Sequence, residues 1–248
     1  MKKYALVTGA SKGIGQAISV ALSACGYDVF INYNTDKNGA KETKTLVEAN
    51  GQRGYIHKGD VSNLSDMKIL FEAIARRTDR LDLLVNNAGT DNDILIEDYP
   101  FDKMKRVLDV NLWGPMIVTK LALPLLKKSE SGQIVNISSR MGNGKLIEGV
   151  GPYAPSKAGL IRFTKCCALE FRKYGIRANA VCPGLTDTDL NRSLFPDQNF
   201  WDEMAEKNPR GRVGYPEDVA NVVSFLASDK GGYVNGEAIG VNGGSNLV

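Results

Sequence analysis

The stretch "TGASKGIG" (residues 8–15) follows a short apolar run and precedes a segment with helical patterning. Its glycines, Gly9, Gly13 and Gly15, have the spacing G-x-x-x-G-x-G. Glycines allow a sharp turn and let backbone N–H groups approach a pyrophosphate, and the positive end of a helix dipole favours the same anion. The stretch therefore predicts a strand, loop and helix that bind a dinucleotide. The alternative is a tight turn without a ligand.

The rest of the chain alternates apolar runs of strand length with amphipathic stretches of helix length. The expected strands are Ala5–Thr8, Val29–Tyr33, Gly54–His57, Leu81–Asn86, Gln133–Ser138, Arg177–Cys182 and Glu237–Val241. The expected helices lie near Ile14–Ala24, Gly39–Ala49, Ser65–Thr78, Phe101–Leu126, Tyr153–Tyr174 and Pro216–Ala227. Strands that are apolar throughout are typical of a parallel sheet covered on both faces. The pattern predicts an α/β Rossmann-type fold, a doubly wound parallel sheet of about seven strands in three α/β/α layers, with residues 1–248 as one domain.

The segment from Thr186 to Arg212 interrupts this alternation. It mixes Asn, Asp, Pro and Arg residues with large apolar side chains such as Phe195, Phe200 and Trp201. Segments of this length without regular patterning are usually functional or partly ordered in compact domains. We therefore expect residues 186–212 to form a lid over the substrate.

Composition excludes several classes of protein. The net charge is only +3 and no run of five or six like charges occurs, so no nucleic-acid partner is expected. No stretch approaches the roughly 18 apolar residues of a membrane span, and the N-terminus lacks the apolar length of a signal peptide. These features predict a cytoplasmic protein. The four cysteines lack C-x-x-C spacing and are expected as reduced, buried thiols, and the single histidine, His57, excludes a histidine-rich metal site.

The choice of dinucleotide is usually made at the end of the second strand. An acid there accepts hydrogen bonds from the ribose 2′-hydroxyl of NAD and repels a 2′-phosphate. Here the strand ends "FINYNT", with Asn34 and Thr35 where that acid would be, and Asp36 comes later. Lys12 in the glycine loop is available to a phosphate, or it is a solvated surface lysine. The missing acid and the lysine together favour NADPH.

A tyrosine and a lysine stand four residues apart in "YAPSK" (residues 153–157), at the start of an expected helix. Residues at this spacing share one helical face, so the phenol of Tyr153 and the ammonium of Lys157 can act together. A free tyrosine has a pKa near 10 and is a poor base at neutral pH. A neighbouring cation favours the phenolate and lowers that pKa.

Other polar side chains follow strands in the same part of the sequence. The strand "GQIVNISS" ends at Ser138 and Ser139, and "LLVNNAG" (residues 83–89) ends in the same manner. The carboxyl ends of parallel strands line the ligand crevice of an open α/β sheet. Asn111 interrupts a long helix, and the following Gly114-Pro115 is expected to kink the chain and free a carbonyl to hold water.

Together these motifs resemble the short-chain dehydrogenase/reductase family over essentially the whole chain. They occur in the family's order: "TGASKGIG", "DV" at 60–61, "NNAG", Asn111, "ISS", "YAPSK", "PGLTDT" at 183–188, "GRVGYPEDVA" at 211–220 and "YVNGEAIGVNGG" near the end. The resemblance implies that Tyr153 is the general acid in carbonyl reduction and that Ser139 polarises the carbonyl. It further implies that Lys157 binds the nicotinamide ribose and lowers the tyrosine pKa, and that Asn111 holds a relay water.

The resemblance also implies the residues that bind the cofactor, NADPH or NADP⁺. They are Gly9, Ser11, Lys12, Gly13, Ile14, Gly15, Asn34, Asp60, Val61, Asn87, Ala88, Gly89, Tyr153, Lys157, Pro183, Gly184, Thr186 and Thr188. Among them, Asp60 and Val61 would contact the adenine and Thr188 the carboxamide. Arg140 and Leu185 are expected at the substrate, where Arg140 either meets an anionic group or points to solvent. No metal is implied.

Within the family, the chain is most similar to the subgroup that reduces 3-oxoacyl thioesters on acyl carrier protein. The alternatives are a steroid, polyol, sugar or other small carbonyl compound as the substrate, or a catalytically idle NADP-binding sensor or scaffold. The sequence departs from the subgroup at Arg140, at Asn235 and in the acidic stretch "GTDNDI" (residues 89–94). Apolar residues occur broadly around the expected helix at 160–171, which together with family precedent predicts a homotetramer.

Overall fold

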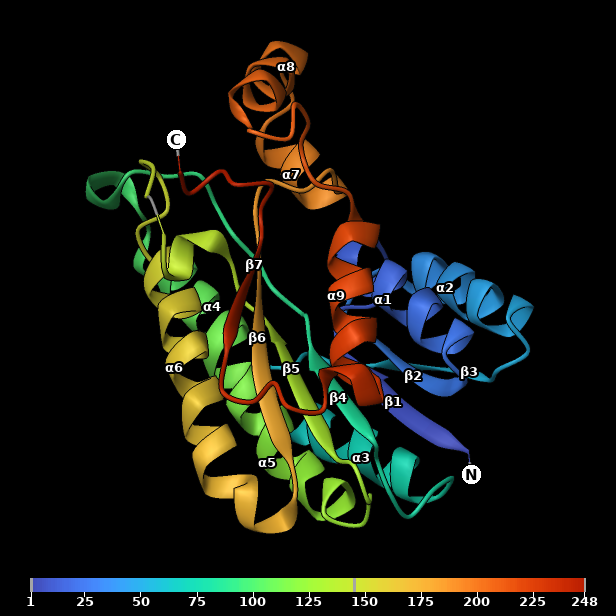
Figure 1. The fold of residues 1–248 in the computed structure, drawn as a ribbon. Helices are drawn as coiled ribbons and strands as arrows, with labels where there is room; N and C mark the ends of the chain where they lie inside the picture. The colour runs from blue at the N-terminus through green and yellow to red at the C-terminus, as the bar shows by residue number, and fades with distance from the viewer. Residues whose placement is uncertain (1, 145, 248) are drawn as a thin grey trace.

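A seven-stranded, wholly parallel sheet forms the centre of the molecule, as Figure 1 shows. The computed structural model describes residues 2–144 and 146–247. The strand order is β3-β2-β1-β4-β5-β6-β7. The strands are β1 (Lys3–Val7), β2 (Tyr27–Tyr33), β3 (Gly54–Lys58), β4 (Leu83–Asn86), β5 (Gln133–Ile137), β6 (Arg177–Pro183) and β7 (Ala238–Val241). The predicted Rossmann-type sheet is thereby confirmed.

Helices cover both faces of the sheet (Figure 1). They are α1 (Gly13–Ala24), α2 (Lys37–Ala49), α3 (Leu64–Ala75), α4 (Phe101–Leu108), α5 (Gly114–Leu126), α6 (Tyr153–Phe171), α7 (Asp189–Leu194), α8 (Gln198–Lys207) and α9 (Pro216–Ala227). Helices α1, α2 and α9 pack on one face, and α3, α5 and α6 on the other. The expected starts and ends of the strands and helices differ from these bounds by at most three residues, and the long helix expected at 101–126 is interrupted.

Side-chain alternation along the strands produces two apolar cores. In β1, Val7 faces the core under α1 and α9, and Leu6 faces the core under α3 and α5. In β4, Leu84 likewise faces opposite to Leu83 and Val85. Successive side chains of a strand point to opposite faces, so both faces of these strands are apolar and buried. This explains why the strands appear in the sequence as continuous apolar runs.

The predicted break in the helix at residues 101–126 is present, but its form differs from the expectation. A π-helical turn, Asp109–Trp113, separates α4 from α5 and contains Asn111. Pro115 lies in the first turn of α5, directly after the π-helical turn, and has no N–H to donate to a carbonyl of that turn. The break is therefore a single widened turn, of the kind often found at functional sites.

The irregular segment at 186–212 folds into two short helices, α7 and α8, at the carboxyl edge of the sheet (Figure 1). Trp201 is 2% exposed, and its indole N–H donates to the Phe195 carbonyl at 2.7 Å. The Phe195 and Phe200 rings stack with centroids 4.5 Å apart. The apolar side chains that interrupted the sequence pattern thus form a small local cluster.

Two of the four cysteines contradict the expectation of burial. Cys167 and Cys182 are buried, whereas Cys25 and Cys166 are exposed, and all four are free thiols. Cys25 caps the end of α1, and Cys166 lies on α6 beside the buried Cys167 but faces outward. Among the described residues, no helix is long and apolar enough to cross a membrane. The same residues contain no cluster of His, Cys, Asp or Glu suited to a metal ion.

Candidate active site

A cleft of about 470 Å³ runs along the carboxyl edge of the sheet. It crosses the point between β1 and β4 where the strand order reverses, which is where open α/β sheets bind ligands. Every residue predicted to bind the cofactor lines it, from the glycine loop through Asn34, Asp60, Asn87 and Lys157 to Thr188, and Ser139 does as well. The tertiary structure therefore brings these dispersed motifs into one continuous groove.

The glycine loop closes one side of the cleft. Gly9 and Gly13 have φ values of 60° and 55°, which L side chains rarely adopt. A Cβ on Gly9 would stand 2.7 Å from the Ala88 Cα, and one on Gly15 would stand 2.4 Å from the Gly9 carbonyl oxygen. The loop is thus packed tightly against the end of β4.

The N-terminus of α1 opens toward the cleft. Lys12 occupies the N-cap position, its side chain caps none of the first N–H groups, and the first turn carries no acidic residue. Uncapped N–H groups at a helix N-terminus form an anion site, so the cleft fits the pyrophosphate of a dinucleotide. The N–H groups that form this anion site belong to the backbone at the start of α1.

The end of β2 carries no acidic side chain, and the first acid after the strand is Asp36. Asp36 lines the cleft, but its Oδ1 accepts a hydrogen bond from the Gly39 N–H at 2.9 Å and caps α2. Lys12 extends along the cleft, and its Nζ lies 3.4 Å from Asp189 Oδ2. Both side chains are more than half exposed, which makes this a weak surface pair. Asp189 is the first residue of α7, and no motif in the sequence pointed to it.

At the other end of the cleft, Tyr153 is the first residue of α6 and lies beside Ser139. The Ser139 Oγ also accepts a hydrogen bond from the Met141 N–H at 3.1 Å. The neighbouring Ser138 points elsewhere, since its hydroxyl donates to the Lys157 carbonyl at 2.9 Å. The geometry therefore agrees with the choice of Ser139 over Ser138.

Burial dominates the acid–base properties of this end. It raises the pKa of Tyr153 to about 12, the carboxyl of Asp91 adds to the effect, and a hydrogen bond with Ser139 opposes it. Burial also lowers the pKa of Lys157 to about 8. In the protein alone the net pKa of Tyr153 is therefore raised, because desolvation of the phenolate outweighs its hydrogen bond with Ser139. That Lys157 lowers this pKa stays a prediction.

The side chain of Lys157 is held within the site by a contact of its ammonium group with the backbone. Its Nζ donates to the Ile137 carbonyl at 3.0 Å and lies 5.5 Å from the centre of the Tyr153 ring. A Cβ on Gly89 would stand 3.5 Å from both Lys157 Nζ and Asn111 Oδ1. The backbone of Gly89 therefore lies between the Lys157 ammonium and the Asn111 side chain.

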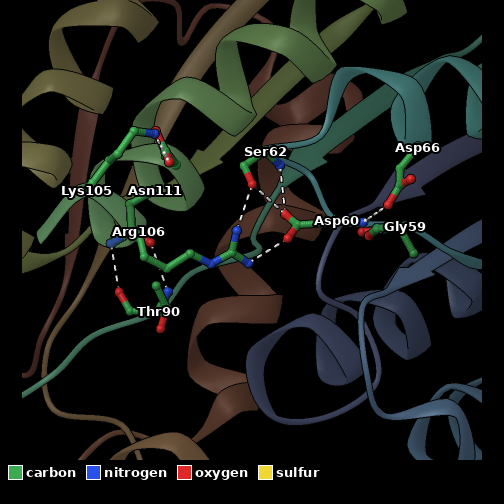
Figure 2. A network of polar contacts seen from close by, with 10 residues as sticks. Gly59, Asp60, Ser62, Asp66, Thr90, Lys105, Arg106 and Asn111 are labelled. Carbon is green, nitrogen blue, oxygen red and sulfur yellow. Dashed lines mark hydrogen bonds and ion pairs between the residues drawn. The ribbon is translucent and has the colours of Figure 1, made fainter. Parts of the chain in front are cut away.

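Asn111 does not line the cleft but lies fully buried behind its wall. Its Oδ1 accepts from the Thr90 N–H, and its Nδ2 donates to the Thr90 carbonyl, both at 2.8 Å (Figure 2). The Nδ2 also lies 3.2 Å from Ser156 Oγ. Its side chain therefore fixes the segment after β4 and leaves only backbone groups of the π-helical turn for a water.

The two predicted substrate residues lie outside the cleft lining. Arg140 begins a 3₁₀ turn directly after Ser139 and is half-buried, which lowers its pKa. Leu185 uses its carbonyl to accept from the Gly214 N–H at 2.9 Å. Both are adjacent in sequence to cleft residues, so contact with a substrate stays a prediction.

Two charged residues of this region were not assigned a role from the sequence. Burial raises the pKa of Asp91 to about 6, and its charge interacts with that of Lys157. Arg106 of α4 lines the cleft and its Nη2 lies 2.7 Å from Asp60 Oδ2 (Figure 2). The acidic stretch at residues 89–94, noted in the sequence, contains Asp91. No sequence spacing connects Arg106 with Asp60.

The family model described as enoyl-(acyl carrier protein) reductase matches residues 9–246. The chain belongs to the short-chain dehydrogenase/reductase family, as its motifs indicated. It is an oxidoreductase that acts on a ketone or an alcohol.

Individual relatives and structures make the similarity more specific. The 3-oxoacyl-[acyl-carrier-protein] reductase FabG of Staphylococcus epidermidis is 37% identical over 98% of this chain and 99% of its own length. FabG of Escherichia coli (strain K12) is 38% identical over 99% and 98%, respectively. The Pseudomonas aeruginosa RhlG/NADP complex covers 99% of this chain and 96% of its own, at 32% identity and a TM-score of 0.92. A variant of actinorhodin polyketide ketoreductase with NADPH covers 100% and 98%, at 31% identity and a TM-score of 0.93.

Proposed function

We propose that the protein uses NADPH to reduce the ketone of a 3-oxoacyl thioester to a secondary alcohol. The observation that carries the proposal is the joint placement of Ser139, Tyr153 and Lys157 at one end of a cleft whose other parts fit a dinucleotide. The similarity to two 3-oxoacyl-[acyl-carrier-protein] reductases over nearly the full chain supports the thioester as substrate class.

The dihydronicotinamide of the bound cofactor supplies the hydride. Tyr153 gives its proton to the carbonyl oxygen of the substrate. Because its pKa lies near 12 in the protein alone, the phenol is fully protonated at neutral pH, which is the form that reduction requires. Ser139 donates a hydrogen bond to the same oxygen and polarises it. Lys157 holds the ribose hydroxyls, and as a cation beside the phenolate it stabilises the deprotonated tyrosine after transfer.

NADPH is preferred over NADH in this proposal because of the groups at the end of β2. Asn34 and Thr35 follow the end of β2, and the first acid, Asp36, comes three residues after the strand, where it caps α2. Lys12 lines the cleft, and a phosphate would replace Asp189 as its partner. Two similar solved structures carry NADP or NADPH in their descriptions, which supports the same choice.

The remaining features complete the proposal. Arg140 and Leu185 contact the substrate, and the lid at 186–212 closes over it within a single domain of residues 1–248. Acyl carrier protein docks on basic residues near the end of α6, Arg172 and Lys173.

Exposed apolar side chains on α4, the π-helical turn and α6 suit subunit contacts in a cytoplasmic homotetramer. They are those of Phe101, Trp113 and Leu169. Light scattering tests the assembly.

Oxidation of NADPH, followed by absorbance, tests the substrate class. The panel contains acetoacetyl-CoA, a 3-oxoacyl chain on acyl carrier protein, a steroid ketone, a small diketone and a sugar. We expect turnover of the thioesters, fastest with the carrier-linked chain. Fast reduction of a ketone or sugar without turnover of any thioester would assign a different substrate class. Binding of NADPH without turnover of any compound would favour a sensor or scaffold.

A further inference from the structure

A side chain from α4 holds the carboxylate of Asp60 at the cleft wall. Arg106 lies 46 positions further along the chain, yet its Nη2 is 2.7 Å from Asp60 Oδ2. Its second terminal nitrogen, Nη1, donates to Ser62 Oγ at 2.8 Å. Figure 2 shows the guanidinium reaching across from α4 to both groups. The two contacts use the planar fork of an arginine, which a lysine cannot reproduce.

Ser62 closes this arrangement into a ring. Its N–H and its hydroxyl both donate to Asp60 Oδ1, at 2.9 and 2.7 Å. Because Ser62 Oγ accepts a hydrogen bond from Arg106, its own hydrogen is directed to Asp60. The backbone is fixed as well, since the Asp60 N–H donates to Asp66 Oδ2 at 2.9 Å. The orientation of the carboxylate is therefore determined by three contacts from two residues, Ser62 and Arg106.

The ring leaves Asp60 with acceptor capacity to spare. An ionised carboxylate offers about four lone-pair positions. Ser62 occupies two on Oδ1 and Arg106 one on Oδ2, which leaves one on Oδ2. Partial burial raises the pKa of Asp60, but the hydrogen bonds from Ser62 and Arg106 bring it below its ordinary value, so the group is ionised. A ligand that fits this position must donate an N–H or O–H.

Asp60 and Arg106 both line the dinucleotide cleft, at the end away from Tyr153. We propose that Arg106 is a positioning residue for adenine recognition: its guanidinium orients the Asp60 carboxylate so that the free Oδ2 lone pair accepts from the amino group of the adenine. This inference rests on the proposed binding of NADPH. It adds a residue from α4 that acts through Asp60 and need not touch the cofactor.

The test compares two cofactors that differ only at the amino group, NADPH and its purine analogue, in which a hydrogen replaces the amino group of the adenine. Their dissociation constants are measured by fluorescence titration, independently of turnover. We expect Arg106→Met to raise the constant for NADPH about tenfold, the size of one charge-assisted hydrogen bond, and that for the analogue less than about twofold. The preference of the wild type for NADPH should therefore nearly vanish.

Three further variants make the test specific. Lys105→Met is the matched control, because Lys105 neighbours Arg106 on α4 but pairs with Asp109 at 2.6 Å (Figure 2). It should leave both constants unchanged. Ser62→Ala removes the other part of the ring and should reduce discrimination in the same direction. Arg106→Lys keeps the charge without the fork and should restore only part of the discrimination.

Each other result has a defined meaning. Equal weakening of both cofactors by Arg106→Met would overturn the inference, because the guanidinium would then contact the cofactor itself. Unchanged discrimination, with or without a lower melting temperature, would also overturn it, because the ring would then serve stability alone. A wild type that binds neither cofactor would instead refute the proposed function.

Discussion

Two aspartates, Asp60 in the wall of the cleft and Asp91 near Lys157 and Tyr153, show how differently one residue type can behave. Asp60 follows β3 and Asp91 follows β4, and each is partly buried next to a cation. The pKa of Asp60 is lowered, because hydrogen bonds from Ser62 and Arg106 outweigh burial. The pKa of Asp91 is raised to about 6, because burial outweighs one hydrogen bond from the Asn92 N–H and the charge of Lys157.

The difference lies in the depth of burial and in the donors that reach each carboxylate. Asp91 is the more deeply buried and accepts a hydrogen bond from the Asn92 N–H, whereas Ser62 and Arg106 both donate to Asp60. A carboxylate removed from water needs several hydrogen bonds to remain ionised, and a distant charge does not replace them. The end of the cleft at Asp60, where we propose that the adenine binds, thus stabilises a fixed negative charge. The end at Tyr153, the proposed catalytic end, disfavours charge, as the shifted pKa values of Tyr153 and Lys157 also show.

The largest effect should come from Tyr153→Phe, which separates the two ends functionally. Loss of the proton donor should reduce the rate of carbonyl reduction by about 10²- to 10⁴-fold, while the dissociation constant for NADPH changes less than about twofold. Steady-state kinetics and fluorescence titration measure the two quantities. A variant that keeps more than about a tenth of the activity would remove Tyr153 as the acid.

Asp91→Asn tests the uncharged character of the catalytic end. The raised pKa means that the folded state holds the Asp91 proton more tightly than the unfolded chain does. The resulting stability is present below about pH 4 and is lost as the pH rises through about 6. The asparagine should therefore raise the free energy of unfolding by about 1–3 kcal/mol at pH 7.5 and have no effect near pH 3.5.

Urea denaturation of both proteins at the two pH values measures this difference. Asp98→Asn, at an exposed acid of the same connection, is the matched control and should leave the free energy of unfolding nearly unchanged at both pH values. A loss of stability at pH 7.5 in the Asp91 variant would mean that the carboxylate is better solvated than its burial indicates.

Lys12→Ala tests the phosphate end of the same cleft. The ammonium should contribute about 1.4 kcal/mol to a bound 2′-phosphate, so the dissociation constant for NADPH should rise about tenfold and that for NADH should stay nearly constant. Titration with both cofactors measures the effect. Equal losses of affinity for NADPH and NADH would mean that Lys12 is a solvated surface lysine that does not contact the 2′-phosphate.

The smallest effect is expected for Asp60→Asn, with a sign opposite to that of Asp91→Asn. A lowered pKa contributes stability above the unfolded pKa, and that stability is lost as the pH falls through the folded value. The variant should lose up to about 1 kcal/mol at pH 7.5, as is usual for a partly exposed ion pair, and this loss should fade in acid. The same urea series measures it. If Asp60→Asn and Asp91→Asn changed the free energy of unfolding in the same direction, the proposed difference between the two aspartates would be refuted.

Local patterns in the sequence were sufficient for the architecture and for the proximity of Tyr153 and Lys157. Continuous apolar runs predicted a buried parallel sheet because strand side chains alternate between two covered faces. The spacing of Tyr153 and Lys157 predicted a shared face because helical geometry depends only on sequence separation. The break at Asn111 was visible as well, although the π-helical turn was not, since it depends on packing against the segment that contains Thr90.

The tertiary structure alone decided which charges meet and which are buried. The pairing of Arg106 with Asp60 and of Lys12 with Asp189 joins residues far apart in the chain, and no periodicity encodes such contacts. The pKa direction of Tyr153 likewise depends on desolvation, which the neighbouring lysine in the sequence does not reveal. Short-range geometry follows from residue spacing, whereas burial and long-range pairing exist only once the chain has folded.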